Sequence, residues 1–411
     1  MDIRINPGTL SGTVMPPPSK SMAHRLIIAA ALGGGISTVR NVAFSQDIEA
    51  TLRCMTAMGA DVGHVEEHIL RIHGLRQSVP QACAPDNLLH FDCGESGSTL
   101  RFLIPIALAV AGGGVFTGQG RLMERPQKPY FDLFDEKGIS WQLENRVLTV
   151  RGSLKAGEYR LPGNVSSQFF TGLLFALALL DKPSAIISTT SLESSDYISM
   201  TIDAMKMAGV PVTVSEDGRV FRVTPAAYAA FDGAVEADWS QAGFWYAANF
   251  LDSQLQLQGL NPHSAQGDMV VSDYYWRLAR PGDATLDISG CPDLLPPLAV
   301  MAAVRQGTTH FVNAARLRIK ESDRLATVSA MLTALGCHTD ELPDALIVHG
   351  GKPLVGGTVD GANDHRIVMA AAIAATVCQR PVTILGAEAV KKSYPDFWDE
   401  YQRLGGVFHV L

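Results

Sequence analysis

Apolar residues recur at helical spacing in several segments of the chain, and a glycine follows each of these segments. In the clearest segment Ile48, Leu52 and Met55 stand at positions i, i+4 and i+7, on one face of a helix that Gly59 can end in the left-handed conformation. A shorter copy begins near Asp273 and is cut by a proline. The same pattern ends at Gly138, Gly209, Gly336 and Gly405. The chain is therefore predicted to contain six units of about seventy residues each.

An earlier segment of each unit combines a strand-like run, a polar turn and an apolar helix. The turns cover residues 18–21, 94–97, 164–167, 238–241, 290–293 and 362–365. Short polar side chains at such places are typical of helix N-termini, where they accept hydrogen bonds from free backbone N–H groups. The helices expected over residues 169–180 and 367–377 are apolar on nearly all sides, which predicts their burial. We expect six mixed α/β units, each with a buried helix inside its own sheet, and the topology stays open at this point.

The composition is that of a folded protein whose overall charge does not favour anionic partners. The chain has 411 residues, of which 47% are hydrophobic and 18% charged, and its mean hydropathy is +0.12. These values exclude a mainly disordered chain. The net charge of -8 disfavours nucleic acid and anionic membranes as partners.

Three features predict a cytoplasmic location. The 6 cysteines are spread along the chain without a Cys-x-x-Cys pair, which fits a reducing compartment. The start, MDIRINPGTLSG, is charged and broken by proline and glycine, unlike a signal peptide. The longest uncharged apolar stretch, residues 103–116, is shorter than the roughly 20 residues that span a bilayer. We expect a soluble protein without a membrane segment.

Basic side chains gather at two of the predicted helix starts. In residues 16–25 (PPPSKSMAHR), Lys20 and Arg25 accompany hydroxyl and backbone N–H groups, which suits a bound anion and equally suits a linker with a solvated lysine. In residues 317–324, Lys320 and Arg324 stand four positions apart and repel each other unless an anion or Glu321 relieves the repulsion. A solvated helix start and a ligand site both stay open for this second run.

Other motifs are weak when taken singly. The turns GESGSTLR (94–101), NDHR (363–366) and KKSYPD (391–396) each fit a structural role, yet cationic residues recur at corresponding turns and are expected to converge on one cleft. Nucleotide binding through a glycine-rich Walker loop is unsupported, and Ser98 stands where a nucleophile elbow needs glycine. The string HVEEH (64–68) matches a zinc motif that requires a helix, but it lies between two strand-like runs. We predict a hairpin there and no catalytic metal.

Together, the motifs resemble those of the enolpyruvyl transferase family. PSKSMAHR, SSQF, SxxY, PD, KESDR, NDHR and KxxPD occur in the family's order over nearly the whole chain. The resemblance implies an α/β (α+β) fold, a two-lobed inside-out α/β barrel with six βαβαββ repeats, three per lobe around a pseudo-threefold axis. One lobe would comprise residues 1–18 and 236–411, the other residues 19–235, and the active site would lie in the cleft between them.

The resemblance also implies a reaction. In the branch of the family that KESDR indicates, the enolpyruvyl group of phosphoenolpyruvate is transferred to the 5-hydroxyl of shikimate 3-phosphate by addition and elimination, and phosphate is released. This reaction belongs to the shikimate pathway to chorismate and aromatic amino acids. The expected partners are these two small anions, and no cofactor, nucleic acid or membrane is expected. The protein is expected to be a monomer whose two lobes close when substrate binds. Two polyanionic substrates would explain clustered cations in an acidic protein.

Site residues are implied by the same resemblance. Asp293 would accept the proton of the 5-hydroxyl, Glu321 would exchange a proton with the methylene carbon, and Lys20 would reach both substrates. The residues implied for shikimate 3-phosphate are Lys20, Ser21, Arg25, Ser166, Ser167, Gln168, Ser194, Tyr197, Asp293 and Lys320. Those implied for phosphoenolpyruvate are Lys20, Gly97, Arg125, Gln168, Arg324, Arg366 and Lys392.

Two alternatives are considered. The branch of the family that acts on UDP-N-acetylglucosamine carries a reactive-loop cysteine in the stretch that corresponds to residues 119–124, where this chain has none. A non-catalytic anion-binding scaffold would have basic turns without the two carboxylates Asp293 and Glu321. The chain also departs from the commoner bacterial pattern at Glu95, Ser98, Phe102 and Arg316, and no substrate contact is assigned to Arg316.

Overall fold

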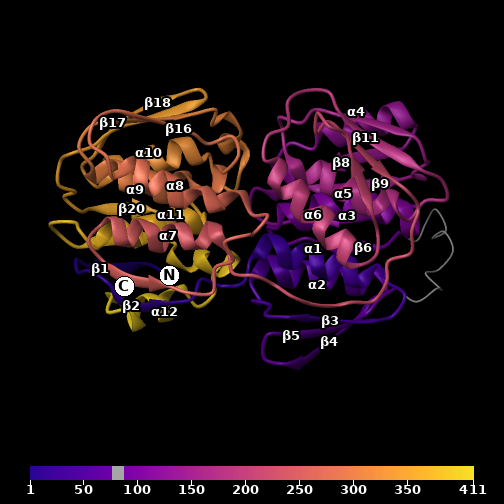
Figure 1. Cartoon of the computed structure of the whole chain (residues 1–411), viewed down its shortest axis with the longest axis horizontal. Helices are drawn as coiled ribbons and strands as arrows, with labels where there is room; N and C mark the ends of the chain where they lie inside the picture. Colours follow the sequence, from indigo (N-terminus) through magenta and orange to yellow (C-terminus); the bar gives the residue numbers. More distant parts are fainter. Residues whose placement is uncertain (76–87) are drawn as a thin grey trace. The chain divides into compact units, whose positions relative to one another are not determined.

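The structure is a computed structural model that describes residues 1–75 and 88–411. The chain divides into two compact units, unit 1 with residues 1–17 and 237–411 and unit 2 with residues 18–236. Each unit contains three repeats, which confirms the predicted mixed α/β fold with six repeated units. In each unit the sheets lie on the outside and the helices fill the interior (Figure 1). Each unit has its own buried apolar core.

Unit 2 consists of three four-stranded sheets with their helices. Its first repeat comprises α1 (Lys20–Ala31), β3 (Ile36–Arg40), α2 (Gln46–Met58), β4 (Asp61–Glu66), β5 (Ile69–His73) and β14 (Asp232–Ala234). The second comprises β6 (His90–Asp92), α3 (Gly97–Ala111), β7 (Gly113–Thr117), η1 (Leu122–Glu124), α4 (Lys128–Lys137), β8 (Ser140–Glu144) and β9 (Val147–Arg151). The third comprises β10 (Glu158–Leu161), α5 (Ser167–Leu177), β11 (Ser184–Ser188), α6 (Ser195–Met207), β12 (Val212–Val214) and β13 (Val220–Val223).

Unit 1 repeats the arrangement with one shortened member. That repeat comprises β2 (Ser11–Val14), α7 (Trp239–Phe250), β15 (Gln254–Leu257), η2 (Gly267–Val270) and α8 (Val271–Leu278). The next comprises β16 (Ala284–Asp287), η3 (Pro292–Leu294), α9 (Leu295–Val304), β17 (Thr308–Val312), η4 (Ala315–Ile319), α10 (Arg324–Ala334), β18 (His338–Leu342) and β19 (Ala345–His349). The last comprises β20 (Thr358–Asp360), α11 (His365–Ala375), β21 (Val382–Leu385), η5 (Ala387–Lys392), α12 (Phe397–Arg403), β22 (Val407–Val410) and β1 (Ile3–Asn6).

The sheet order is the same in the five complete repeats. Two parallel strands, such as β6 and β7, are followed by an antiparallel pair, giving the order β6-β7-β9-β8. The shortened repeat has only the parallel pair β2 and β15, because α8 ends at Leu278, just before Pro281, and β16 follows directly. This is the copy that the sequence pattern showed as degenerate. The HVEEH string lies in the β4–β5 hairpin, as predicted.

Local sequence signals explain most helix boundaries. Side chains of Ser19, Ser96, Ser166, Asp238 and Asp364 accept hydrogen bonds from backbone N–H groups at the starts of α1, α3, α5, α7 and α11. Five of the six predicted polar turns thus act as N-caps. Gly59 and Gly138 end α2 and α4 in the left-handed conformation, with φ of 112° and 68°. The helices that follow the caps are buried as predicted.

No helix in the described ranges 1–75 and 88–411 is long and apolar enough to cross a membrane.

Candidate active site

The residues of unit 2 predicted to bind shikimate 3-phosphate lie at the N-terminal ends of three helices. Lys20, Ser21 and Arg25 lie on the first turns of α1, Ser167 and Gln168 begin α5 after the cap Ser166, and Tyr197 lies on α6 after Ser194. Helix N-termini carry partial positive charge and free N–H groups, which favours anions. Ser194 adopts a left-handed conformation, with φ of 54°, which is uncommon for a residue with a side chain.

Arg25 ties these helices together. Its guanidinium is 2% exposed and donates to the carbonyls of Ser21 (2.7 Å) and Tyr197 (2.9 Å) and to the hydroxyls of Thr201 (2.9 Å) and Thr171 (3.4 Å). All four acceptors are neutral, and no carboxylate of the described residues pairs with Arg25. Burial lowers the pKa of Arg25 to about 10. A buried cation without a counterion favours an anionic ligand nearby, although four of its five N–H groups are already used.

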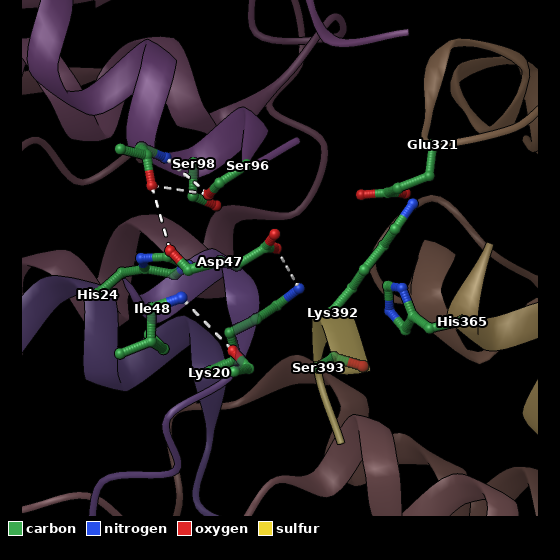
Figure 2. Close-up of polar contacts among 12 residues, drawn as sticks. Lys20, His24, Asp47, Ile48, Ser96, Ser98, Glu321, His365, Lys392 and Ser393 are labelled. Atoms are coloured by element: carbon green, nitrogen blue, oxygen red, sulfur yellow. Dashed lines mark hydrogen bonds and ion pairs between the residues drawn. The ribbon is translucent and has the colours of Figure 1, made fainter. Parts of the chain in front are cut away.

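Lys20 is held by a carboxylate. Its Nζ lies 2.7 Å from Oδ2 of Asp47, at the start of α2, and both side chains are largely buried (Figure 2). Asp47 directly precedes Ile48 of the predicted helix, and no role was predicted for it. The ion pair fixes the ammonium group at the N-terminal end of α1.

Gln168 is oriented from both sides. Its Oε1 accepts from Nη1 of Arg101 (2.7 Å), and its Nε2 donates to Oγ of Ser98 (3.0 Å). Arg101 also donates to the carbonyl of Pro126 (2.9 Å), and its guanidinium lies over the ring of Phe169. No role was predicted for Arg101, although it belongs to the GESGSTLR turn. The structure places it behind Gln168 as a positioning group.

Gly97 and Arg125 are in direct contact. A Cβ atom at Gly97 would lie 2.5 Å from Nη1 and 2.8 Å from Cζ of Arg125. Arg125 is 8% exposed, so its guanidinium has little room to move away. A side chain at position 97 would therefore displace one of the cations predicted to bind phosphoenolpyruvate.

We expect Gly97→Ala to raise KM for phosphoenolpyruvate roughly tenfold to hundredfold, because accommodating the methyl group costs about 1–3 kcal/mol. Initial rates at saturating shikimate 3-phosphate measure the effect. Gly34→Ala is the control, since a Cβ at Gly34 meets nothing within 4 Å. An unchanged KM in Gly97→Ala would contradict the predicted role of Arg125.

Unit 1 gathers four predicted residues around the carboxylate of a fifth, Asp293. Oδ1 of Asp293 lies 2.7 Å from Nη1 of Arg324 and 3.5 Å from Nζ of Lys320, and its Oδ2 lies 3.0 Å from Nη2 of Arg366. Nη2 of Arg324 also bonds Oε2 of Glu321 at 2.5 Å. The two predicted catalytic carboxylates thus share one arginine. Arg324 is buried and Lys320 is partly buried, both beside carboxylates, which does not fit the solvated helix start considered for residues 317–324.

Asp364 anchors this cluster and had no predicted role. It is fully buried, caps α11 through the backbone N–H of Arg366, and accepts from Nε of Arg324 (2.8 Å) and from the hydroxyl of Ser322 (2.9 Å). It belongs to the NDHR motif, but its partners lie about forty positions away, so local pattern could not reveal them. Asp364 fixes the plane of the Arg324 guanidinium.

The electrostatics of the cluster favour different protonation states for its members. Burial would raise the pKa of Asp293, but Arg366, Lys320 and Arg324 together hold it well below its usual value. Burial lowers the pKa of Lys320 to about 8, aided by Arg324 and Arg316 and opposed by Asp293 and Glu321. Lys320 is therefore the cation of this cluster most easily deprotonated.

Lys392 lies near the same motif. Its Nζ donates to the carbonyl of Asn363 (2.7 Å), at the turn before α11, where Ala362 and Asn363 both have positive φ. Figure 2 shows the side chains of Lys392 and Glu321, both in unit 1, pointing toward one another. The predicted cations of unit 1 thus converge.

Each of the four departures from the bacterial pattern has a local contact in the structure. Phe102 is buried, and the centroid of its ring lies 5.2 Å from Cζ of Arg25, so the ring packs against the guanidinium. The Glu95 carboxylate lies against Gly120, where a Cβ would approach Oε2 to 2.5 Å. Arg316 donates to the carbonyl of Ser289 (2.6 Å). Ser98, as noted, holds Gln168.

Comparisons with known proteins show the family of this chain. The family model described as EPSP synthase (3-phosphoshikimate 1-carboxyvinyltransferase) matches residues 5–279 and 280–401. A protein named 3-phosphoshikimate 1-carboxyvinyltransferase from Clostridium beijerinckii is 42% identical, covering 99% of this chain and 98% of its own. One of the same name from Clostridium acetobutylicum is 43% identical, with the same coverage.

Solved structures show the same fold at lower identity. An EPSP synthase from Acinetobacter baumannii superposes with a TM-score of 0.79 at 23% identity, covering 99% of both chains. The enolpyruvyl transferase NikO from Streptomyces tendae gives 0.77 at 15% identity, covering 99% of this chain and 98% of its own. Family model, relatives and fold lead to one assignment: the chain belongs to the EPSP synthase (3-phosphoshikimate 1-carboxyvinyltransferase) family.

Proposed function

We propose that this protein transfers the enolpyruvyl group of phosphoenolpyruvate to the 5-hydroxyl of shikimate 3-phosphate and releases phosphate. The observation that carries the proposal is the position of Asp293 between Lys320, Arg324 and Arg366, with Glu321 on the same arginine. A pair of carboxylates among cations suits proton transfer between anionic substrates. A non-catalytic anion-binding scaffold would not need the carboxylates. The names of the relatives do not favour the UDP-N-acetylglucosamine branch.

The cations of unit 1 are proposed to change partners when substrate binds. Arg324 and Arg366 hold Asp293 as a weak base in the structure, because their charges lower its pKa. The carboxylate and phosphate of phosphoenolpyruvate would compete for the same guanidinium groups, whose planar donors fit both anions. As these ion pairs weaken, the pKa of Asp293 rises and the carboxylate becomes a stronger base. Substrate binding thus activates the base.

The chemical steps are assigned to these residues. Asp293 accepts the proton of the 5-hydroxyl group while the oxygen of that hydroxyl group forms a bond to C2 of phosphoenolpyruvate. Glu321 donates a proton to the methylene carbon, which becomes a methyl group. In the elimination step the C2–O bond to phosphate breaks, phosphate leaves with the proton that Asp293 had accepted, and Glu321 takes back a proton from the methyl group, restoring the double bond. Lys20, held by Asp47, contacts both substrates. No cofactor is needed in this scheme.

Unit 2 is proposed to hold shikimate 3-phosphate at its helix N-termini. Ser166 and Ser167 at the start of α5 would bind the 3-phosphate, where helix polarity favours negative charge. The ring of shikimate 3-phosphate would be surrounded by Ser21, Ser194, Tyr197 and Gln168. The buried guanidinium of Arg25 would add positive charge near this ligand. Gly97 and Arg125 would bind phosphoenolpyruvate.

The proposal is tested by measuring phosphate release with phosphoenolpyruvate and either acceptor. We expect release with shikimate 3-phosphate and none with UDP-N-acetylglucosamine, and omission of either substrate should abolish the signal. The reverse acceptor preference would overturn the proposal. We further propose that the enzyme acts in the cytoplasm and that it is a monomer. Light scattering after gel filtration measures its molar mass and so tests the monomeric state.

The activity should fall in alkaline solution because of Lys320. With a pKa of about 8, this side chain loses its proton above that pH, and a neutral amine holds an anionic substrate less well. We expect kcat/KM for shikimate 3-phosphate to decline about tenfold per pH unit above pH 8. Lys320→Arg keeps its charge and should move the decline to higher pH. A wild-type profile that stays flat to pH 9.5 would refute this role.

A further inference from the structure

A group of metal-ligand side chains lies on the β18–β19 hairpin of unit 1. His338 and Asp340 lie on β18, and His349 lies on β19 directly opposite His338. Successive residues of a strand point to opposite faces, so positions 338 and 340 share a face, and pairing brings His349 beside them. One nitrogen or oxygen ligand atom from each residue lies within 4.8 Å of the others. This is the one such group in residues 1–75 and 88–411.

The distances within the group suit a small cation. Nε2 of His349 lies 2.7 Å from Oδ2 of Asp340, and Nε2 of His338 lies 3.7 Å from Oδ1. Tetrahedral ligands about 2.0–2.2 Å from Zn²⁺ are about 3.4 Å apart, so shifts of about 1 Å would bring these atoms to binding distance. The side chain of His338 is 71% exposed, that of Asp340 48% and that of His349 37%. Rotation of these side chains therefore meets little resistance.

The backbone beneath these side chains is well held. Leu346 and Val348 of β19 are fully buried, so the opposite face of the hairpin is anchored in the core. The buried thiol of Cys337 donates to the carbonyls of His338 (3.7 Å) and His349 (3.6 Å). The imidazole rings are nearly parallel, with centroids 4.9 Å apart. Two strands in fixed register therefore present three ligands without loop closure.

We propose that His338, Asp340 and His349 bind one divalent transition-metal ion of the Zn²⁺ type on the outer face of this hairpin. Two imidazoles and one carboxylate match the preferences of Zn²⁺, Co²⁺ and Ni²⁺, whereas Mg²⁺ and Ca²⁺ need more oxygen ligands. Water completes the tetrahedron. None of the three residues belongs to the proposed catalytic machinery, so this site is independent of the proposed function. The competing explanation is a cluster in which Asp340 merely pairs with the two histidines.

Co²⁺ and Zn²⁺ titration distinguishes these explanations. The untagged full-length protein, freed of metal with EDTA and then of EDTA, should bind one Co²⁺ per chain with the visible absorption of tetrahedral coordination, and Zn²⁺ should displace it. Mg²⁺ should not compete. His338→Ala, His349→Ala and Asp340→Asn should each weaken binding by about tenfold or more.

His409→Ala is the matched control, because His409 is also an exposed histidine on an edge strand, β22. It should bind Co²⁺ like the wild type. Phosphate release in metal-free buffer should be the same in all of these variants, which also shows that they are folded. Absence of saturable binding in the wild type, or equal affinity in His338→Ala and His349→Ala, would overturn the proposal.

Discussion

Asp293→Asn is expected to lower kcat by about 10²- to 10⁴-fold while both substrates still bind. The amide has the shape of the carboxylate but cannot accept the proton of the 5-hydroxyl. Removing a negative charge from among Lys320, Arg324 and Arg366 leaves these cations more available to phosphoenolpyruvate. Calorimetry should therefore show phosphoenolpyruvate binding at least as tightly as in the wild type, and single-turnover kinetics should locate the loss in the chemical step.

Asp287→Asn serves as the control for this substitution. Asp287 lies six positions earlier, and its carboxylate holds the backbone N–H of Ser289 and the amide of Asn313 without contacting the cations. Its kcat should be near that of the wild type. A kcat for Asp293→Asn within tenfold of the wild type would exclude Asp293 as the base.

Arg324→Met is expected to cost about 3–5 kcal/mol of the free energy of unfolding of unit 1, in addition to abolishing activity. The guanidinium is 1% exposed and bonds the carboxylates of Asp293, Glu321 and Asp364. Burial would lower the pKa of Arg324, but these three carboxylates raise it, so the side chain stays charged. Removing the guanidinium leaves three carboxylates close together without this shared cation. Asp293 and Glu321 are partly buried and Asp364 is fully buried, so their negative charges are poorly solvated.

Urea denaturation measures the loss, and Arg318→Met is the control. Arg318 also pairs with two carboxylates, Asp323 and Glu341, but it is partly exposed and should contribute at most about 1 kcal/mol through these pairs. Arg324→Lys keeps one charge and should recover part of the stability. Equal losses in Arg324→Met and Arg318→Met would contradict a special role for the buried cluster.

The sequence predicted helix boundaries well where the signal is local. Serine and aspartate caps and terminal glycines act within one helical turn, so residues such as Ser166 and Gly59 could be located without the fold. Asp293, Lys320 and Arg324 were named because the ordered set of motifs resembles the family, and the structure brings them together. The shortened repeat was visible because a proline interrupts its helix pattern.

Long-range partners could not be predicted in this way. Asp364 bonds Arg324 from forty positions away, and Asp47 pairs with Lys20 from the next helix. Strand β1 lies between β21 and β22, with Ile3 opposite Ile384 and Val410, and no periodicity near residue 3 indicates those neighbours. Such contacts depend on topology, which the pattern of apolar residues had left open.

The position of β1 has a consequence for synthesis on the ribosome. Unit 2 is one continuous segment, residues 18–236, so all of its strands and helices have been made when little more than half of the chain exists. Strand β1 is made before unit 2 but pairs with β21 and β22, which are made after it. Since domains tend to fold as their chain is completed, we expect unit 2 to fold first. Ile3 and Ile5 would meanwhile lack their native sheet partners, and unit 1 could be completed only after β21 and β22 have been made.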